Sequence, residues 1–484
     1  MVFSSTIFLF LFLPIVILAY FMAGSRGRNL VLLLASLVFY AWGETIYLLL
    51  MLTSISLNYV VGLLLEHSRR KGASGRGPLI FGLTANLGLL GFFKYGNFLV
   101  DNFNGLLAVL HISPVVPPSI HLPIGISFFT FQAMSYVVDL YKGVTRVQKN
   151  PVNMALYISL FPQLIAGPIV RYHDIAGAID RRTTSSADFA AGTQRFIIGM
   201  GKKVLIANEL GQTADYLFSL PPDRLPATLA WVGALAYTFQ IYYDFSGYSD
   251  MAIGLGRMFG FHFPENFNFP YISQSIREFW RRWHISLSTW FRDYLYFPLG
   301  GSRKSPARTY INLVTVFFLC GLWHGASWTF VVWGLYHGLF LVLERTGPGK
   351  RVLEAMPPFL RTGYAMLVVI IGWVMFRAET FSYGFYYIRA MFSPGRPPLY
   401  NSQIFLNMNS IFYFTFAVAA LCFLPLDRIA QTLRSRCSGK GQRSILPVAP
   451  LLVPGRILAL ALVFVYSVAN IMGSSYNPFL YFRF

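Results

Sequence analysis

Charged residues are scarce in this sequence, and acidic residues are the scarcest of them. Only 12% of the 484 residues are charged, whereas about 25% are charged in an ordinary soluble domain. The shortage argues against a soluble cytosolic enzyme, and the hydrophobic content of 55% argues against a disordered protein. Cysteine is also rare, with three residues and no CxxC pair, so the sequence predicts neither a disulfide framework nor a zinc site.

Several common catalytic motifs are missing as well. The sequence has no GxxxxGK(S/T) phosphate loop, no HExxH metalloprotease pair and no GxSxG nucleophile elbow. Gly254, Gly256 and Gly260 have the wrong spacing for a dinucleotide fingerprint. Close packing of helices through small residues is the better interpretation of these glycines.

Hydrophobic and aromatic residues take the place of the missing charge. Aromatic side chains make up 17% of the chain, and the mean hydropathy is +0.53. This composition predicts one polytopic membrane domain over residues 1–484, whose apolar surface faces lipid or neighbouring helices. The formal charge of +20 fits cytoplasmic loops that carry Lys and Arg to set the topology. We therefore expect the lipid bilayer, and no nucleic acid, as a partner.

The apolar runs predict roughly ten to thirteen embedded helices. The first run precedes Arg26 and Arg28 instead of following a basic segment, so we expect a retained helix with its N-terminus outside. The later runs lie at 29–42, 45–65, 78–110, 122–140, 151–170, 190–220, 228–260, 309–323, 326–343, 362–376, 407–424 and 457–473. Gly, Pro or polar residues interrupt several runs, and broken helices need protein or water around them, which predicts a cavity inside the bilayer.

Four basic segments are expected on the cytoplasmic side of the membrane. They lie at 69–76, 142–149, 277–308 and 428–456. For the first two to share that side, residues 78–110 must cross the membrane once, as one long or bent helix that includes Lys94. The last apolar run then ends outside and places the aromatic tail, residues 476–484, on the outer face.

Residues 275–292 have the period of an amphipathic helix. Its predicted basic face consists of Arg277, Arg281, His284, Ser288 and Arg292, and its opposite face is aromatic and aliphatic. Such a helix is typical of the membrane interface. His284 is then either an interfacial polar residue without chemistry or a residue at a cavity mouth. In the second case the basic face would hold an anionic donor, such as the phosphates of coenzyme A.

His324 lies between two apolar runs, in the stretch CGLWHGASW at 320–328. An ionisable residue at membrane depth is costly to bury and marks a candidate functional site. Its neutral imidazole could take the proton of a hydroxyl as general base, the role that acyl transfer to an alcohol requires. The alternative is a structural histidine bonded to a neighbouring helix. The flanking Gly321 and Gly325 would let backbone or substrate approach.

Other polar residues in the apolar runs are weaker candidates. His337 lies thirteen residues beyond His324, on another face of a straight helix, which favours a structural role. Cys320 precedes His324 by one turn and is expected to be a small buried hydrophobe rather than a nucleophile. Asp244 and Asp250 lie six residues apart and could orient a histidine or pair with an arginine.

Several long motifs, found in order along the chain, carry a resemblance to a known family. They are MVFSSTIFLFLFLP at the start, LPIGISFFTFQAMSY at 122–136, FPQLIAGPI at 161–169, YYDFSGYSDMAIGLG at 242–256, NFNFPYISQSIREFWRRWHISLSTWFRDYLYFPLGG at 266–301, GLWHGASWTFVVWGLYHG at 321–338 and FLYFRF at the end. Over essentially its whole length the chain resembles the membrane-bound O-acyltransferase superfamily, and within it the bacterial alginate O-acetylase branch.

The resemblance implies an all-α ring of tilted helices around a central funnel, in a multi-pass protein of the bacterial inner membrane. It maps the family's invariant histidine onto His324 and a second signature residue onto His284. It also implies acetyl-CoA as the cytoplasmic donor, with Arg277 and Arg281 as candidates for binding its phosphates. No permanently bound cofactor and no metal are expected. The acetyl group would pass outward to an extracytoplasmic partner of the serine-hydrolase type and then to an exopolysaccharide such as alginate.

The aromatic tail is similar to a C-terminal motif of related systems, in which a tyrosine is proposed to carry the acyl group. Here that residue would be Tyr481, whose phenol would take the acyl group with His324 as the base. The alternative role for Tyr481 is that of an aromatic residue at the outer membrane interface.

Other functions are also compatible with the sequence. An enzyme of the same fold could acetylate cellulose or peptidoglycan, or transfer D-alanine to teichoic acid. A transporter with His324 in a proton path would be a different class, but the sequence shows no repeated halves. A third class would be a non-catalytic scaffold of a polymer-export complex.

Overall fold

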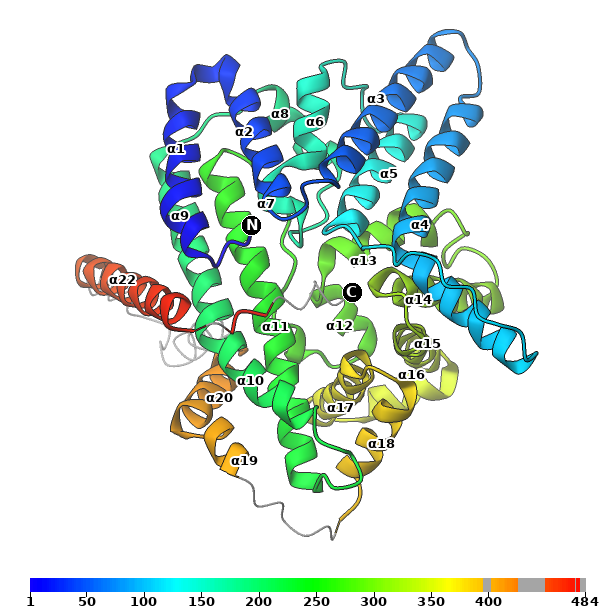
Figure 1. Ribbon diagram of the computed structural model, residues 1–484, viewed down its shortest axis with the longest axis vertical. Helices are drawn as coiled ribbons and strands as arrows, with labels where there is room; N and C mark the ends of the chain where they lie inside the picture. The colour runs from blue at the N-terminus through cyan, green and yellow to red at the C-terminus, as the bar shows by residue number, and fades with distance from the viewer. Residues whose placement is uncertain (395–401, 425–448, 475, 479–484) are drawn as a thin grey trace, which may run out of the picture.

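The computed structural model describes residues 1–394, 402–424, 449–474 and 476–478 (Figure 1). Within these ranges every regular element is a helix, which confirms the predicted all-α fold. The first half of the chain forms η1 (Phe8–Phe12), α1 (Leu13–Met22), α2 (Gly24–Ala41), α3 (Leu48–Arg70), α4 (Arg76–Val109), α5 (Ile126–Lys142), α6 (Pro151–Ser159), α7 (Phe161–Leu164), α8 (Tyr172–Asp180), α9 (Ser186–Gly201), η2 (Lys202–Ala207), α10 (Asn208–Leu217) and α11 (Ala227–Met258). The second half forms η3 (Pro270–Ile272), α12 (Ile276–Arg282), α13 (Ile285–Phe291), η4 (Arg292–Tyr296), α14 (Pro306–His324), α15 (Trp328–Leu343), α16 (Gly347–Ala355), α17 (Pro358–Arg377), α18 (Phe381–Met391), α19 (Ser402–Asn407), α20 (Ser410–Cys422) and α22 (Ala449–Gly473).

Four of the described helices are long and apolar enough to cross a membrane. They are α3, α4, α17 and the part of α22 from Pro454 to Gly473. Residues 78–110 form one helix, α4, as predicted. Its 34 residues extend about 51 Å at ~1.5 Å per residue, well beyond a hydrocarbon core of ~30 Å. Lys94 lies near the middle of this helix and is buried.

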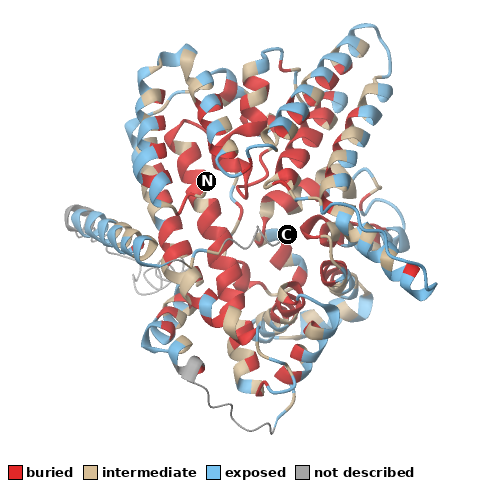
Figure 2. Cartoon of the chain, viewed as in Figure 1, coloured by how far each residue is buried: buried red, intermediate tan, exposed pale blue. Residues whose placement is uncertain are grey.

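Helix α11 forms the core of the molecule, and most of its length is buried (Figure 2). It packs closely on α9 because glycines of the two helices face each other. A Cβ added at Gly254 would lie 2.6 Å from the carbonyl oxygen of Gly192. Gly199 and Gly247 make the same kind of contact further along the two helices. Gly254 therefore serves close helix packing, as the sequence predicted.

Helices α14 and α15 form a hairpin that brings His324 into the interior. His324 is the last residue of α14, and the extended backbone of Gly325 ends the helix. The two helices approach closely at Gly321 and Gly334, where an added Cβ would collide with the backbone of the other helix. Gly321 thus admits a neighbouring helix.

The short helices α12 and α13 lie in the middle of the molecule (Figure 1). In this view α11 is on one side of them and the α14–α15 hairpin on the other. Helix α12 contacts α15 and α17, and α13 continues into the π-helical turn η4. Turns of this kind are frequent at functional sites. The segment that contains His284 is thereby set next to the helices that carry His324.

The turns after α1 and after α3 lie at the same end of the molecule (Figure 1, top). The basic residues near 26–28 and 69–76, which the sequence places on one side of the membrane, lie at or next to these turns. Helix α22 lies at the periphery, and it is exposed along most of its length (Figure 2). Most of the basic segment 428–456 falls outside the described residues.

Candidate active site

The imidazole of His324 is buried among aromatic rings. The residue is 6% exposed, and its ring makes edge contacts with Trp323, Trp333 and Phe376 at centroid distances of 5.0, 4.9 and 5.3 Å. Neither ring nitrogen has a hydrogen-bond partner among the described residues. Such a histidine can accept a proton from a substrate without first breaking a bond to the protein.

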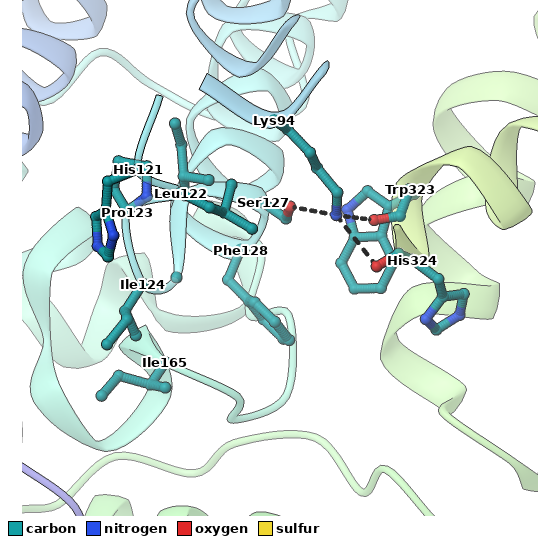
Figure 3. A pocket seen from close by; sticks show the side chains of 12 residues that line it. Lys94, His121, Leu122, Pro123, Ile124, Ser127, Phe128, Ile165, Trp323 and His324 are labelled. Carbon is teal, nitrogen blue, oxygen red and sulfur yellow. Dashed lines mark hydrogen bonds between the residues drawn. The ribbon is translucent and has the colours of Figure 1, made fainter. Parts of the chain in front are cut away.

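Lys94 and Tyr95 of α4 hold the last turn of α14. The Lys94 ammonium donates to the carbonyl oxygens of Trp323 and His324, the latter at 3.3 Å (Figure 3). The Tyr95 hydroxyl donates to the carbonyl oxygen of Leu322 at 2.5 Å. Carbonyls at a helix C-terminus lack partners within the helix and carry partial negative charge, so a cation there is favourable. In Figure 3 the imidazole of His324 extends away from Lys94, so Lys94 fixes the backbone of His324 and not its ring.

A cavity of about 310 Å³ lies beside the backbone of His324 (Figure 3). It is lined by Lys94, His121, Leu122, Pro123, Ile124, Gly125, Ile126, Ser127, Phe128, Ile165, Trp323 and His324, and we call it the Lys94 cavity. Lys94 donates to Ser127 Oγ at 3.1 Å across this space. Glu44 accepts from the backbone N–H of Ile124 at 3.1 Å and lies 3.2 Å from Nε2 of His121. The cavity thus combines apolar walls with several fixed polar groups.

The predicted continuous helix over residues 275–292 is wrong. Helix α12 ends at Arg282 and α13 begins at Ile285. Between them His284 has a left-handed backbone, with φ 45° and ψ 54°, which is uncommon for a residue with a side chain. The break turns His284 into the interior, where it is 0% exposed, so it lies neither at the membrane interface nor at a cavity mouth.

Asn266, from the loop after α11, holds this break in place. Its backbone carbonyl accepts the N–H of Ile285 at 3.0 Å. Its side-chain oxygen accepts from the backbone N–H and the hydroxyl of Ser286 at 3.2 and 2.9 Å. The side-chain nitrogen donates to Ser249 Oγ at 3.1 Å, which fixes the orientation of the amide.

The same amide sets the protonation pattern of His284. Nδ1 of His284 lies 3.1 Å from the side-chain oxygen of Asn266, and an amide oxygen only accepts, so Nδ1 carries the proton. Nε2 then has the lone pair, and it has no partner among the described residues. Trp323 contacts the rings of both His284 and His324, at 5.9 and 5.0 Å. The two histidines therefore flank one tryptophan.

A second cavity, of about 190 Å³, lies among arginines. It is lined by Arg277, Trp280, Arg281, Leu287, Ser288, Phe291, Arg292, Tyr296, Leu313, Val316, Phe317, Cys320 and Leu341, and we call it the arginine cavity. The predicted basic face is thus assembled, apart from His284, even though the helix is broken. The apolar lining reaches Cys320, which precedes His324 by one helical turn, about 6 Å along α14.

Known proteins are similar in sequence to this chain, some of them over its whole length. Residues 142–376 match the model of the membrane-bound O-acyltransferase family. The Pseudomonas aeruginosa protein named "Probable alginate O-acetylase AlgI" is 43% identical over all of both chains, and so is the Azotobacter vinelandii protein of the same name. The peptidoglycan O-acetyltransferase of Helicobacter pylori is 40% identical over 78% of this chain and 77% of that protein. The chain belongs to the membrane-bound O-acyltransferase family. It is an integral membrane acyltransferase, which confirms the resemblance seen in the motifs.

In this acyltransferase the two predicted acids pair with cations. Asp244 lies 2.5 Å from the ammonium of Lys203, and both side chains are buried. Asp250 pairs with Arg195 at 2.8 Å and with Lys202 at 2.6 Å. Neither acid contacts a histidine in the described structure, so pairing with a cation is the alternative that the structure selects for both.

Tyr481 lies outside the residues that the structure describes, but the residues just before it are fixed. The Tyr476 hydroxyl donates to Asp215 at 2.7 Å, and the ammonium of Lys203 donates to the carbonyl oxygen of Pro478. The described part of the tail therefore ends beside Lys203.

Two further residues of the histidine region are buried. His337 is fully buried, and its ring contacts Trp280 and Trp333 at 5.3 and 5.1 Å. Neither of its ring nitrogens has a hydrogen-bond partner in the described part of the chain. Cys320 is buried at the apolar end of the arginine cavity.

Sequence reasoning missed three residues that shape the site. Lys94 was noted only as part of a crossing helix, although a lysine inside an apolar run is itself a signal of a special role. Asn266 gave no local signal because its partners lie about twenty residues away in the sequence. Glu344 accepts the backbone N–H groups of Ile276 and Arg277, at 2.6 and 3.1 Å, and so caps α12 from the end of α15.

Proposed function

We propose that this enzyme transfers acetyl groups from acetyl-CoA, on the cytoplasmic side of a bacterial inner membrane, to an exopolysaccharide such as alginate on the outer side. The observation that carries the proposal is the place of His324. It lies buried, with two unpaired ring nitrogens, between the apolar end of the arginine cavity and the Lys94 cavity. The whole-length similarity to two alginate O-acetylases supports the choice of polymer.

The arginine cavity suits the proposed donor. Arg277, Arg281 and Arg292 offer guanidinium groups, which bind phosphate oxygens through paired N–H donors. The apolar lining from Leu313 to Cys320 suits the less polar arm of the donor and leads toward His324. The thioester would then meet the imidazole at the inner end of this path.

His324 would act as the general base of the transfer. A ring nitrogen takes the proton of the acceptor hydroxyl while the hydroxyl oxygen bonds to the acetyl carbon. The carbon–sulfur bond then breaks, and the leaving thiolate takes the proton from the imidazolium. His284, with Nε2 unprotonated and its ring against Trp323, would position the donor or the acceptor.

The acceptor would approach through the Lys94 cavity. We infer that an extracytoplasmic partner of the serine-hydrolase type completes the transfer to the polymer. The acetyl group reaches this partner either directly or through Tyr481. The hydrogen bond from Lys203 to Pro478 supports the second route, because it holds the described end of the tail at the buried Lys203.

Peptidoglycan is the second candidate acceptor. The observation in its favour is the 40% identity with the Helicobacter pylori peptidoglycan O-acetyltransferase over 78% of this chain. The two candidates share the donor and the base, and they differ only in which polymer gains acetyl esters.

The test is the acetate released by mild alkali from each purified polymer, in cells with matched membrane levels of the variants. We expect His324→Ala to lower the acetyl content of alginate by at least about 100-fold, the lower end of what a general base contributes. His262→Ala, which changes an exposed histidine, serves as the control and should keep the wild-type content. Loss in Tyr481→Phe as well would favour the tyrosine route. Normal acetylation in His324→Ala would refute the assignment of the base. Acetyl esters found on peptidoglycan alone would mean that peptidoglycan, and not alginate, is the acceptor.

A further inference from the structure

A third cavity, of about 310 Å³, lies where α3 and α5 end, away from His284 and His324. It is lined by Leu65, Glu66, Arg69, Leu140, Thr145, Arg146, Val147 and Lys149, and we call it the basic cavity. Its only carboxylate, that of Glu66, is already bonded to Arg70 at 2.9 Å. Arg69, Arg146 and Lys149 form no ion pair within the described structure. The cavity therefore holds three cations without a matching anion.

The loop that carries two of these cations is held rigidly. The Tyr59 hydroxyl donates to the backbone carbonyl of Lys149 at 2.8 Å. The backbone N–H of Gln148 donates to the Tyr136 hydroxyl at 3.1 Å, and its side chain donates to the Tyr172 hydroxyl at 3.0 Å. Three tyrosines from three helices thus fix the backbone of the loop, so less conformational freedom is lost when a ligand binds its cations.

Arg69 is positioned by a glycine. Gly143 has a φ of +74°, and a Cβ added there would lie 2.9 Å from a terminal nitrogen of the Arg69 guanidinium. The guanidinium therefore occupies the space above a residue that only glycine suits. This placement keeps Arg69 against the end of α5, facing the loop with Arg146.

The cations lie where a membrane helix leaves the bilayer core. Helix α3 is one of the four long apolar helices, and Arg69 is in its last turn. About one and a half to two and a half turns earlier, Val60, Leu63 and Leu64 are 49%, 37% and 43% exposed, as expected for side chains that face lipid tails. Phosphates of a bilayer lie at the level where such a helix ends.

We propose that the basic cavity binds the phosphodiester headgroup of an acidic phospholipid, whose acyl chains lie along the exposed face of α3. Guanidinium groups match phosphate oxygens in shape and charge. A free phosphate ester is also an anion with phosphate oxygens, but the adjoining apolar face of α3 favours a ligand with acyl chains. This site is separate from the proposed acetyl transfer and does not depend on it.

The test compares lipid binding by the purified full-length protein in a neutral detergent. Phosphatidylglycerol is titrated and the bound lipid is counted by native mass spectrometry, with phosphatidylcholine as the neutral reference. The double variant Arg69→Gln/Arg146→Gln should bind phosphatidylglycerol at least about tenfold more weakly, because each cation near a lipid phosphate contributes about fivefold. The matched control Lys71→Gln/Arg76→Gln removes two exposed cations from the neighbouring turn and should retain wild-type binding.

Three results would overturn the site. Equal weakening in the double variant and its control would mean general attraction between charges. Equal binding of phosphatidylcholine would mean that the cations are not involved. If glycerol 1-phosphate competes at the same concentration as phosphatidylglycerol, the ligand of the cavity is a soluble phosphate ester and not a lipid. If the double variant does not fold, Arg146→Gln alone, in an exposed loop position, should show the fivefold loss.

Discussion

At the scale of single residues, the state of His284 depends on one side chain, that of Asn266. Its amide oxygen meets Nδ1 of His284 and both polar groups of Ser286. A neutral histidine has one N–H, and the hydrogen bond to an acceptor decides which nitrogen carries it. Asn266 therefore leaves Nε2 as the acceptor. Replacement of Asn266 should change the chemistry of His284 without touching His284 itself.

We expect Asn266→Ala to lower acetyl transfer by roughly ten- to 100-fold, the range seen when a residue that orients a histidine is lost. Asn266→Asp should retain more activity because a carboxylate still accepts from Nδ1. The polymer acetyl assay measures both, with Asn102→Ala, on an exposed part of α4, as the control. Full activity in Asn266→Ala at normal membrane levels would show that the proton position on His284 does not matter.

Lys94 acts on the other histidine through the backbone. All three of its N–H donors are used, on Ser127, Trp323 and His324. Lys94 also forms no ion pair with a carboxylate in the described structure, so the carbonyls at the end of α14 are what stabilise its charge. This arrangement makes Lys94 a positioning residue for His324.

We expect Lys94→Met to lower kcat by about tenfold or more while the KM for the donor stays within about twofold, because the arginine cavity is untouched. Lys94→Arg keeps the cation at the helix end and should restore part of kcat. Steady-state kinetics in membrane vesicles, with acetyl-CoA supplied to the cytoplasmic face, separates the two constants. A rise in KM alone would place Lys94 in donor binding instead.

At the scale of elements, the central segment shows where sequence patterns succeed and where they fail. Hydrophobicity predicted α4 and most other helices because burial in lipid depends on composition and length. The amphipathic period predicted one helix over residues 275–292, and that prediction failed at His284. Asn266 sets that break through tertiary hydrogen bonds, which no local period reveals. The arginines still meet in one cavity, because α12 and η4 both contribute to its wall.

Helix α12 depends on a residue more than sixty positions away. Glu344, which follows α15, accepts the first backbone N–H groups of α12 and so holds Arg277 at the arginine cavity. Burial raises the pKa of the Glu344 carboxyl above its ordinary value, and the two backbone donors oppose that rise. As the pH falls, Glu344 therefore takes up its proton at a higher pH than an exposed glutamate would. Protonation weakens the cap.

We expect Glu344→Gln to raise the KM for acetyl-CoA about three- to tenfold at neutral pH, the effect of losing a helix cap of about 1 kcal/mol. In the wild type the KM should rise as the pH falls through the raised pKa, and in the variant this rise should disappear. A pH series of initial rates tests both statements. A variant that retains the wild-type pH dependence would exclude Glu344 as the titrating group.

At the scale of the whole molecule, two cavities reach the same helix at successive levels. The arginine cavity is lined by α14 from Leu313 to Cys320, and the Lys94 cavity is lined by its last two residues, Trp323 and His324. From Leu313 to His324 the helix rises about 16 Å, roughly half the thickness of a bilayer core. His324 thus stands where a path from the arginine cavity and a path from the Lys94 cavity can meet.

This arrangement predicts that the two cavities can be blocked separately. Ile124→Trp/Ile165→Trp narrows the Lys94 cavity and should lower polymer acetylation by about tenfold or more, while coenzyme A binds the purified protein as before. Leu313→Trp narrows the arginine cavity and should weaken coenzyme A binding by a similar factor. Val116→Trp, at a residue that is 86% exposed, serves as the control for both. Only a protein with two entrances to His324 can lose acceptor access and donor access independently. Equal loss of coenzyme A binding in both cavity variants would therefore mean that a single path serves donor and acceptor.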